Sequence, residues 1–263
     1  MKFQTRQQVP PPNARGATQA NSEHLEGTPL ERFNTYFETR IAGDAQSVRI
    51  AQTIRYQVYC VERPHEKSDN PDSLEIDDFD SNSVHGLLIH RPSRIAMGTV
   101  RLVLPAAHAS ETSFPLQGLV GDDFLKKAGL PIASTAEISR FCISRQFRRR
   151  AADTLYGELE TDDAAAEKRA ERRSGPLMRL GLMQAIVRLS REQHLTHWCA
   201  VMEPTLLRML DAMGIHFIRI GELVQYHGWR QPCTGNIAEM LGTLKREQPE
   251  YWDVIKGEGP LAN

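Results

Sequence analysis

The 263-residue sequence has few cysteines and no long apolar run. Its four cysteines, Cys60, Cys142, Cys199 and Cys233, show no C-x-x-C spacing. The opening residues, MKFQTRQQVPPP, lack the apolar stretch of a signal peptide, and no segment approaches the roughly 18 apolar residues of a transmembrane helix. We therefore expect a reduced, cytoplasmic protein with no integral membrane span.

The sequence also lacks the short motifs of several functional classes. Neither G-x-x-x-x-G-K-[ST] nor G-x-S-x-G occurs, which argues against P-loop nucleotide hydrolysis and against an α/β-hydrolase nucleophile. The nine histidines show neither H-E-x-x-H nor a paired Cys/His spacing, so we expect no metal site. A nucleophilic Cys142 or Cys199 is an alternative, although cysteine is more often a buried core residue. The formal net charge of −1 argues against a nucleic-acid partner.

Large apolar residues are almost absent from residues 1–28, so we predict a flexible tail there. Residues 29–263 are expected to form one domain, because 40% hydrophobic and 25% charged residues are average values for a globular protein. Residues 153–174 are rich in Ala, Glu, Asp and Arg and show no apolar face, which indicates an insertion, either helical or partly mobile.

Apolar periodicity predicts alternating helices and strands along this domain. Helices are expected at 30–36, 45–61 with Asp44 as its cap, 119–127, 176–192, 204–213 and 237–246. Strands are expected at 37–41, 84–90, 95–104, 135–143, 196–202 and 215–220, with a hairpin turn between the second and third. The pattern predicts an α/β fold with a mixed central sheet flanked by helices.

Six acidic residues lie within residues 69–80, DNPDSLEIDDFD. The turn formers at its start favour a solvated loop. The spacing does not match the EF-hand pattern, so calcium binding is not expected. A third interpretation is a buried ionic cluster, in which Asp77 or Asp80 pairs with Arg55 or Arg101.

The strand predicted at 135–143 carries charges on both faces. Strict alternation places Glu137, Ser139 and Phe141 on one face, and Ile138, Arg140 and Cys142 on the other. An ordinary surface strand has one apolar face. At least one charge therefore lines a cleft or has a buried partner, unless this is an edge strand with a structural salt bridge.

Four charged segments follow one another in an order that resembles the acyl-homoserine-lactone synthases. The succession is Arg55 with Tyr59, then EIDDFD at 75–80, then GTVRL at 98–102, then EISRF at 137–141. Extended through FRRR at 147–150, the sequence is similar to the PEP-CTERM/exosortase-associated acyltransferases. The resemblance spans about residues 30–245 and implies a GNAT-type acyltransferase fold.

The resemblance also implies a set of site residues. Glu137 is the expected base, because an amine must lose a proton to attack a thioester. The catalytic set is Glu137, Ser139 and Arg140, and the substrate-binding set is Arg55, Tyr59, Asp77, Asp80, Arg101 and Phe141. Backbone N–H groups at a bulged edge of the 135–143 strand are expected to stabilise the oxyanion.

The arginines after this strand are expected to bind the acyl donor, unless they form only a basic surface turn. They are Arg145, Arg148, Arg149 and Arg150, with help from Lys168, Arg172 and Arg173. They suit the phosphate of phosphopantetheine or the acidic surface of an acyl carrier protein. Residues 146–151 contain no glycine of the kind that GNAT-type folds use for coenzyme A, which favours a carrier-protein donor.

The acceptor is expected to be a small amine. Acyl-homoserine-lactone synthases usually carry a tryptophan where this chain has residues 60–64, CVERP, and this difference favours an amino acid or related amine. The predicted activity is N-acyl transfer of a long chain from a carrier-protein or CoA thioester, with no tightly bound cofactor. The alternatives are an acyl-homoserine-lactone synthase that uses S-adenosylmethionine, and a non-catalytic GNAT-like module that binds an acyl ligand.

Overall fold

A mixed sheet forms the centre of the computed structural model, which describes residues 27–66, 70–106, 113–121, 123–145 and 164–257, with the backbone alone over 164–174. The strand order is β1-β2-β3-β4-β5-β8-β6, and β7 pairs with β8. Every described pair is antiparallel apart from β4 with β5. The strands are β1 (Phe37–Ala42), β2 (Ser83–His90), β3 (Ile95–Val103), β4 (Thr135–Ile143), β5 (His197–Met202), β6 (Ile218–Arg219), β7 (Val224–Gln225) and β8 (Trp229–Asn236).

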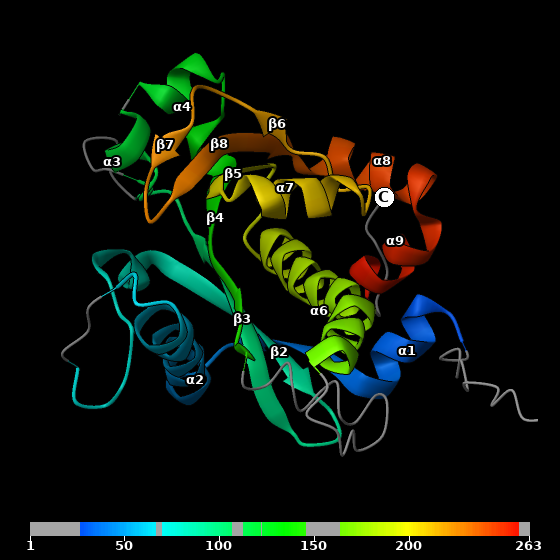
Figure 1. Ribbon diagram of the computed structural model, residues 1–263. Helices are drawn as coiled ribbons and strands as arrows, with labels where there is room; N and C mark the ends of the chain where they lie inside the picture. Colours follow the sequence, from blue (N-terminus) through cyan, green and yellow to red (C-terminus); the bar gives the residue numbers. More distant parts are fainter. Residues whose placement is uncertain (1–26, 67–69, 107–112, 122, 146–163, 258–263) are drawn as a thin grey trace, which may run out of the picture.

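Helices cover both faces of this sheet, which confirms the expected mixed sheet flanked by helices (Figure 1). The α-helices are α1 (Pro29–Tyr36), α2 (Ala45–Tyr56), α3 (Gln117–Val120), α4 (Phe124–Lys127), α6 (Ala164–Glu192), α7 (Pro204–Asp211), α8 (Ile237–Glu247) and α9 (Pro249–Lys256). A π-helix, η1 (Gln57–Glu62), continues α2, and two short 3-10 helices are η2 (Asp78–Asn82) and η3 (Ile132–Ser134). None of the helices described is long and apolar enough to cross a lipid bilayer.

The first half of the chain folds largely as its local sequence predicts. The Asp44 side chain accepts a hydrogen bond of 2.7 Å from the Ser47 N–H, so the predicted cap of α2 is confirmed. The predicted hairpin is β2 with β3, and β4 has the expected bounds. The single helix expected at 119–127 is instead two short ones, because Gly121 at φ +91° ends α3.

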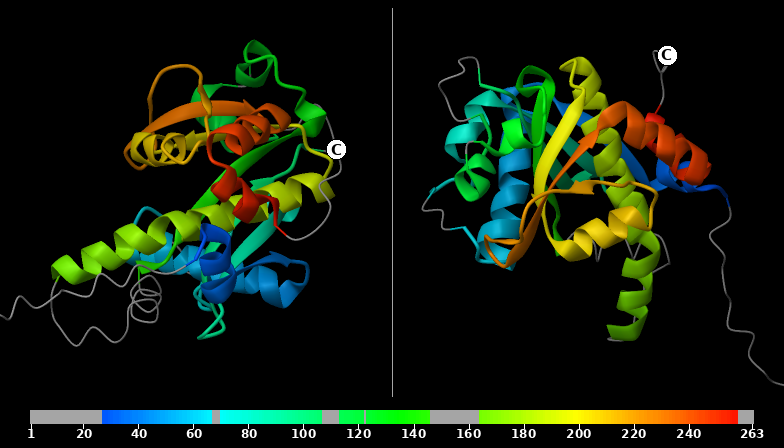
Figure 2. Two further views of the ribbon diagram at one scale, coloured as in Figure 1. Left: turned by 90° about the vertical axis from the view of Figure 1, so that its right-hand side faces the viewer. Right: turned by 90° about the horizontal axis from the view of Figure 1, so that it is seen from above.

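The long helix α6 packs against one face of β1, β2 and β3, and α2 packs against the other (Figure 1). Gly86 of β2 shows how closely α6 approaches, because a Cβ at this position would lie 2.5 Å from the Cβ of Ala185. The start of α6 extends beyond the body of the molecule (Figure 2). The two helices therefore cover opposite faces of the sheet over β1, β2 and β3.

The start of α6 differs from the start predicted from the sequence. A start at 174–176 is wrong, because the helix begins at Ala164 and continues through Pro176. A proline inside a helix removes one hydrogen bond, but strong helix formers upstream keep the helix continuous. Residues 164–174 of the predicted insertion thus belong to α6, whereas residues 153–163 and most of the predicted tail lie outside the described residues.

The second half shows two further differences from the expectation. The strand expected at 215–220 is reduced to the two residues of β6. β8 and α9 were not predicted at all, although β8 is the long partner of β5. A proline and a glycine inside β8, Pro232 and Gly235, hide its strand character in the sequence.

β4 and β5 stay together over a short distance only. They pair in parallel through Thr135–Glu137 and His197–Cys199, and the ladder ends there. Beyond Glu137, β4 remains paired with β3, and β5 remains paired with β8. The two strands therefore diverge in a V, and the end of their pairing leaves room for a ligand beside the backbone of β4.

Candidate active site

A pocket of about 610 Å³ occupies the space where β4 and β5 diverge. Every residue of β4 from Glu137 to Ile143 lines it, as do Val201 and Met202 of β5. Further apolar residues line it from α6 and α7, namely Met178, Leu206 and Met209. A long apolar wall beside the backbone of a splayed strand suits an extended chain such as an acyl thioester.

A β-bulge in β4 decides which side chains face the pocket and which face α2. Ser139 pairs with Arg101, and Cys142 pairs with Thr99, so two residues of β4, Arg140 and Phe141, lie opposite one residue of β3. Arg140 has φ +52°, a left-handed backbone conformation. The bulge therefore interrupts the regular alternation of faces in the middle of the strand.

The face assignment made from strict alternation is therefore wrong from Arg140 onwards. Arg140 lies on the same side as Ser139, where it contacts acids from the 75–80 segment. Phe141 turns to the α6 side and packs against the core there, whereas Cys142 packs with the α2 cluster. The extra residue of the bulge reverses the orientation of everything that follows it.

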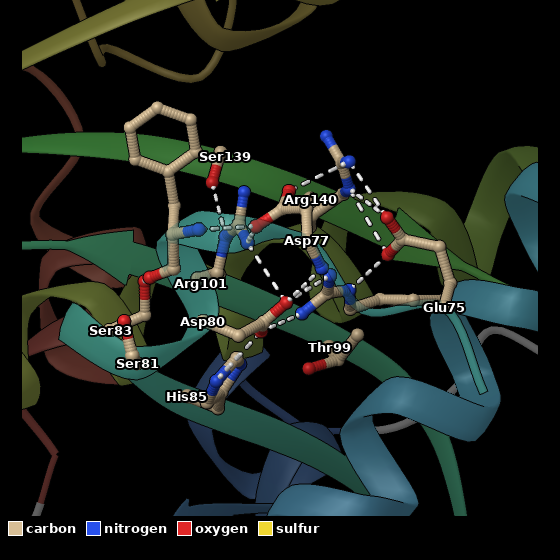
Figure 3. A network of polar contacts seen from close by, with 12 residues as sticks. Glu75, Asp77, Asp80, Ser81, Ser83, His85, Thr99, Arg101, Ser139 and Arg140 are labelled. Carbon is tan, nitrogen blue, oxygen red and sulfur yellow. Dashed lines mark hydrogen bonds and ion pairs between the residues drawn. The ribbon is translucent and has the colours of Figure 1, made fainter. Parts of the chain in front are cut away.

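Six charged side chains form one ionic network on the α2 side of the bulge. They are three arginines and three acids joined by short contacts: Arg55, Arg101, Arg140, Glu75, Asp77 and Asp80. Figure 3 shows this network and labels all of its members apart from Arg55. Their formal charges cancel. The buried-cluster interpretation of the acidic segment is thus confirmed, and the solvated-loop interpretation is wrong for these three acids.

Asp80 lies at the centre of the ionic network. Its carboxylate accepts from Nη1 and Nη2 of Arg55, the latter at 2.9 Å, and lies 3.4 Å from Nη1 of Arg101. Its Oδ2 also accepts a hydrogen bond of 2.8 Å from the Asp77 N–H. Both arginine side chains are fully buried. Glu75 and Asp80 together accept from all three side-chain nitrogens of Arg55, whereas Nη2 of Arg101 is buried with no hydrogen-bond partner among the described residues.

Asp77 and Arg140 connect the ionic network to the pocket, which both residues line. Asp77 Oδ1 accepts from Arg101 Nη1 at 2.6 Å, and Asp77 Oδ2 accepts from Arg140 Nη2 at 3.1 Å. Burial raises the pKa of Asp77, but the hydrogen bond from Arg101 and the positive charges of Arg101, Arg140 and Arg55 together outweigh it and hold the pKa at about 2. The Arg140 guanidinium also pairs with Glu75 at 2.8 Å and lies 5.4 Å from the centre of the Tyr59 ring.

Glu137 is the acid that the ionic network does not neutralise. Its side chain is 4% exposed, and its Oε2 accepts a hydrogen bond of 2.9 Å from the Leu116 N–H at the start of α3. Burial raises the pKa of Glu137 to about 7, even though the Leu116 N–H and Arg101 both act to lower it. A carboxylate in a pocket wall with this pKa can exchange a proton at neutral pH.

Ser139 has a hydroxyl that can donate a hydrogen bond to a ligand, whereas Cys142 has a thiol of low reactivity. The Ser139 hydroxyl oxygen accepts from Arg101 Nε at 2.9 Å, which leaves its O–H free to donate into the pocket that it lines. Burial raises the pKa of Cys142 to about 12, so its thiol stays protonated and is a poor nucleophile. All four cysteines are free, and no group of three His, Cys, Asp or Glu side chains in the described ranges is placed to hold a metal ion.

The residues expected at the donor end are only partly described. Arg145 is exposed, and its N–H donates to both carboxylate oxygens of Glu62, at 2.9 and 3.0 Å. Ser144 Oγ donates to the same carboxylate at 2.5 Å. Arg148, Arg149 and Arg150 lie outside the described residues, and Lys168, Arg172 and Arg173 lie where only the backbone of α6 is described.

Sequence reasoning left out several residues that the structure brings to the site. Glu75 is part of the EIDDFD motif but not of the expected site residues, yet it bridges Arg55 and Arg140. His85 lies opposite Arg101 in the hairpin, and burial lowers its pKa to about 4, so it is neutral beside the ionic network. The hairpin register was the signal that could have located it. The residues that line the pocket from near β7 and β8, such as Arg230, gave no signal.

Residues 54–157 match the family model described as "Acetyltransferase (GNAT) domain". This segment contains all of the ionic network and all of β4, including the bulge and Glu137. The chain carries a GNAT-type acyltransferase domain. No curated protein sequence matches the chain.

Solved structures with similar folds include two enzymes that join acyl groups to small molecules. BjaI, a CoA-dependent acyl-homoserine lactone synthase solved with MTA, is 20% identical, with a TM-score of 0.56, over 86% of this chain and 95% of BjaI. FeeM, an N-acyl amino acid synthase from uncultured soil microbes, is 13% identical, with a TM-score of 0.51, over 80% of this chain and 95% of FeeM.

TofI, solved in a ternary complex with an inhibitor and MTA, is 18% identical, with a TM-score of 0.54, over 80% of this chain and 96% of TofI. At such identities these likenesses concern the fold. They show that this chain shares one architecture with these three proteins over 80–86% of its length.

Proposed function

We propose that the GNAT-type domain transfers a long-chain acyl group from a phosphopantetheine thioester to the amine of an amino acid or related small molecule. The observation that carries this proposal is Glu137, a buried carboxylate with a pKa of about 7 in the wall of a pocket between diverging strands. The donor is a thioester on acyl carrier protein or on CoA. FeeM, which shares the fold, is by description an N-acyl amino acid synthase.

The proposed reaction forms a C–N bond and breaks a C–S bond. Glu137 takes a proton from the acceptor ammonium, directly or through water, and the freed lone pair attacks the thioester carbonyl carbon. Backbone N–H groups of β4 that lack a β5 partner stabilise the oxyanion. When the C–S bond breaks, the thiolate takes the proton that Glu137 carries, directly or relayed through the Ser139 hydroxyl. The nitrogen then loses its second proton to the regenerated carboxylate and from there to solvent, so the products are an amide, a thiol and one proton, and no covalent enzyme intermediate forms.

The ionic network has a positioning role in this proposal. Arg55, Arg101, Asp77 and Asp80 hold α2, η2, β3 and the bulge in one arrangement, and Arg140 with Tyr59 forms the polar part of the pocket wall. Phe141 lines the pocket from the α6 side, where it suits the acyl chain better than the polar acceptor.

The pH dependence of acyl transfer tests the role of Glu137. The rate at saturating donor is expected to rise with pH through about 7 and then to level, because only the ionised carboxylate accepts a proton. The measurement is initial rate against pH for the wild type and for Glu137→Gln. If the rate of the variant rises with pH in the same way, the titrating group is the amine of the acceptor, and Glu137 is not the base.

The arginines after β4 are proposed to bind the donor, on sequence grounds alone for Arg148, Arg149 and Arg150. The double charge reversal of Arg148 and Arg149 to Glu is expected to weaken binding of an acidic acyl carrier protein by about tenfold or more at low salt. The effect should shrink as salt is added. Arg188→Glu, an exposed arginine on α6, is the matched control. An affinity that is equal in all three proteins at every salt concentration would reject carrier-protein docking at these arginines.

Product analysis tests the function as a whole. Purified protein is incubated with long-chain acyl carrier protein or acyl-CoA and a panel of amines, and products are identified by mass spectrometry. An N-acyl amino acid supports the proposal, whereas an acyl-homoserine lactone formed from S-adenosylmethionine supports the alternative synthase. Tight acyl-ligand binding without any product would indicate a binding module.

Two finer assignments complete the proposal. The four free cysteines suit a reducing compartment, so we place the reaction in the cytoplasm. We also propose a relation to the exosortase-associated acyltransferases, and the FRRR sequence at 147–150 supports it. Comparing lipid extracts from cells that express the wild type or Glu137→Gln would identify the natural product.

A further inference from the structure

One end of the pocket holds two arginines that share a single carboxylate. Arg63 follows η1, and Arg230 lies in β8, so the two come from distant parts of the sequence. Glu203 precedes α7, and its Oε1 lies 3.2 Å from Arg63 Nη1 and 3.4 Å from Arg230 Nη2. All three residues line the pocket. We call them the arginine pair and its bridging acid.

Within this group of three side chains, positive charges outnumber negative charges by one. Two guanidinium groups meet one carboxylate, and both use the same oxygen of it. The Arg230 side chain is only 14% exposed, and the one other hydrogen bond from its guanidinium is to the Trp229 carbonyl oxygen, at 3.1 Å, among the residues that the structure describes. A largely buried guanidinium with spare donors is a favourable place for an anion.

The other acids at this end of the pocket are engaged elsewhere. Glu62 accepts from Ser144 Oγ and from the Arg145 N–H. Glu66 accepts from the Tyr226 hydroxyl at 3.3 Å and lies 3.4 Å from His227 Nε2. The ionic network is neutral by itself. Glu66 Oε1 also lies 3.6 Å from Arg140 Nη2. Among the acids that the structure describes, Glu203 is thus the one that contacts Arg63 and Arg230, and the two guanidinium groups share it.

The two arginines also affect the pKa of a neighbouring histidine, His65. Burial lowers the pKa of His65, and His227, Arg230 and Arg63 lower it further, while Glu203 acts in the opposite direction. His65 also stacks on His227, with 5.1 Å between ring centres. The arginine pair and the two stacked histidines thus lie together in the wall of the pocket that also contains Glu137.

We propose that Arg63 and Arg230 bind the carboxylate of the acceptor, so that the acceptor class is amino acids with a free carboxylate. Arginine matches this group because its planar fork donates two parallel hydrogen bonds to a carboxylate. The inference rests on the proposed function, since it names the substrate that Glu137 would deprotonate. The carboxylate anchors one end of the acceptor and leaves its amine directed into the pocket.

The kinetic test compares each amino acid with its α-amide, which keeps the amine but lacks the negative charge. With the wild type and a long-chain acyl thioester, transfer to amino acids is expected and transfer to the amides should be lower by about 10- to 100-fold in kcat/KM. Arg230→Gln should raise KM for the amino acid by a similar factor and leave KM for the donor unchanged. Arg230→Lys keeps the charge but not the fork, so its KM should lie between the two.

The matched control is Arg219→Gln. Arg219 lies on the neighbouring strand β6, pairs with Asp211 at 2.9 Å and does not line the pocket. It should behave as the wild type with every acceptor. If Arg230→Gln raises KM for the donor instead of the acceptor, the anion at this corner is a donor phosphate and the inference is wrong. Equal transfer to amino acids and amides would also overturn it, while leaving the acyltransferase function intact.

A binding measurement decides the inference even if no transfer is found. The melting temperature of the wild type, without donor, is recorded with each of the common L-α-amino acids and with the corresponding amides. At least one amino acid should raise it, its amide should not, and Arg230→Gln should lose the shift although its own melting temperature without ligand is close to that of Arg219→Gln. Absence of any shift, or a shift that Arg230→Gln retains, would reject the carboxylate site.

Discussion

Replacing Glu137 with Gln is expected to lower the rate of acyl transfer about 10²- to 10⁴-fold, the range for loss of a general base. The amide has nearly the same shape and can still accept the hydrogen bond from the Leu116 N–H, so the pocket should keep its form. It cannot take a proton from the acceptor. Steady-state kinetics with saturating donor and acceptor would measure the loss, and a rate within threefold of the wild type would contradict it.

Stability measurements separate this catalytic effect from damage to the fold. Burial raises the pKa of Glu137 from its ordinary value of 4.5 to about 7, so the folded state holds a proton that the unfolded state releases. Ionised Glu137 therefore lowers stability progressively as pH rises from about 4.5 to 7. Glu137→Gln removes this loss and should be no less stable than the wild type at pH 8. The control for the kinetics is Glu222→Gln, an exposed acid outside the pocket.

Replacing Asp80 with Asn is expected to cost about 3–5 kcal/mol of folding free energy, the range for breaking a buried ion pair on one side. The change leaves the buried Arg55 guanidinium without its main counter-ion and gives the ionic network a net charge. An Asn amide also presents two donors to arginines that need acceptors. Urea unfolding at neutral pH measures the free energy directly.

The neighbouring acid supplies the matched control. Asp78 has the same chemistry two residues away, but it is exposed and takes no part in the ionic network. Asp78→Asn should change stability by no more than about 0.5 kcal/mol, as surface substitutions usually do. A similar cost for the two variants would mean that charge density in the 69–80 segment matters, and that the pairing with Arg55 does not.

The sequence predicted the ionic network well because charges in the core must pair. Arg55 and Arg101 lie within apolar patterns, and a charged residue there is stable only with a counter-ion. The acidic segment was the nearest source of carboxylates. Which acids turn inward could not be settled by composition, since Asp77 and Asp78 are adjacent and identical, and only Asp77 faces an arginine.

Features that depend on pairing between distant segments were not predictable from local patterns. The bulge at Arg140 breaks the alternation of faces, and no residue in the EISRF segment marks it, because the left-handed conformation falls on an arginine instead of a glycine. β8 contains Pro232 and becomes a strand through its register with β5. The position of Arg230 in the pocket wall depends on this strand pairing, which the local sequence does not predict.

The short pairing of β4 with β5 places Glu137 at the point where the two strands separate. Three residue pairs join the strands, and Glu137 belongs to the last of them, so it sits at the vertex where the two arms of the sheet separate. When two arms swing about a vertex, points far along them move most. A change in the angle between the arms therefore displaces Ile143 and Met202 more than the carboxylate. The proposed base therefore lies where such a change would move the backbone least.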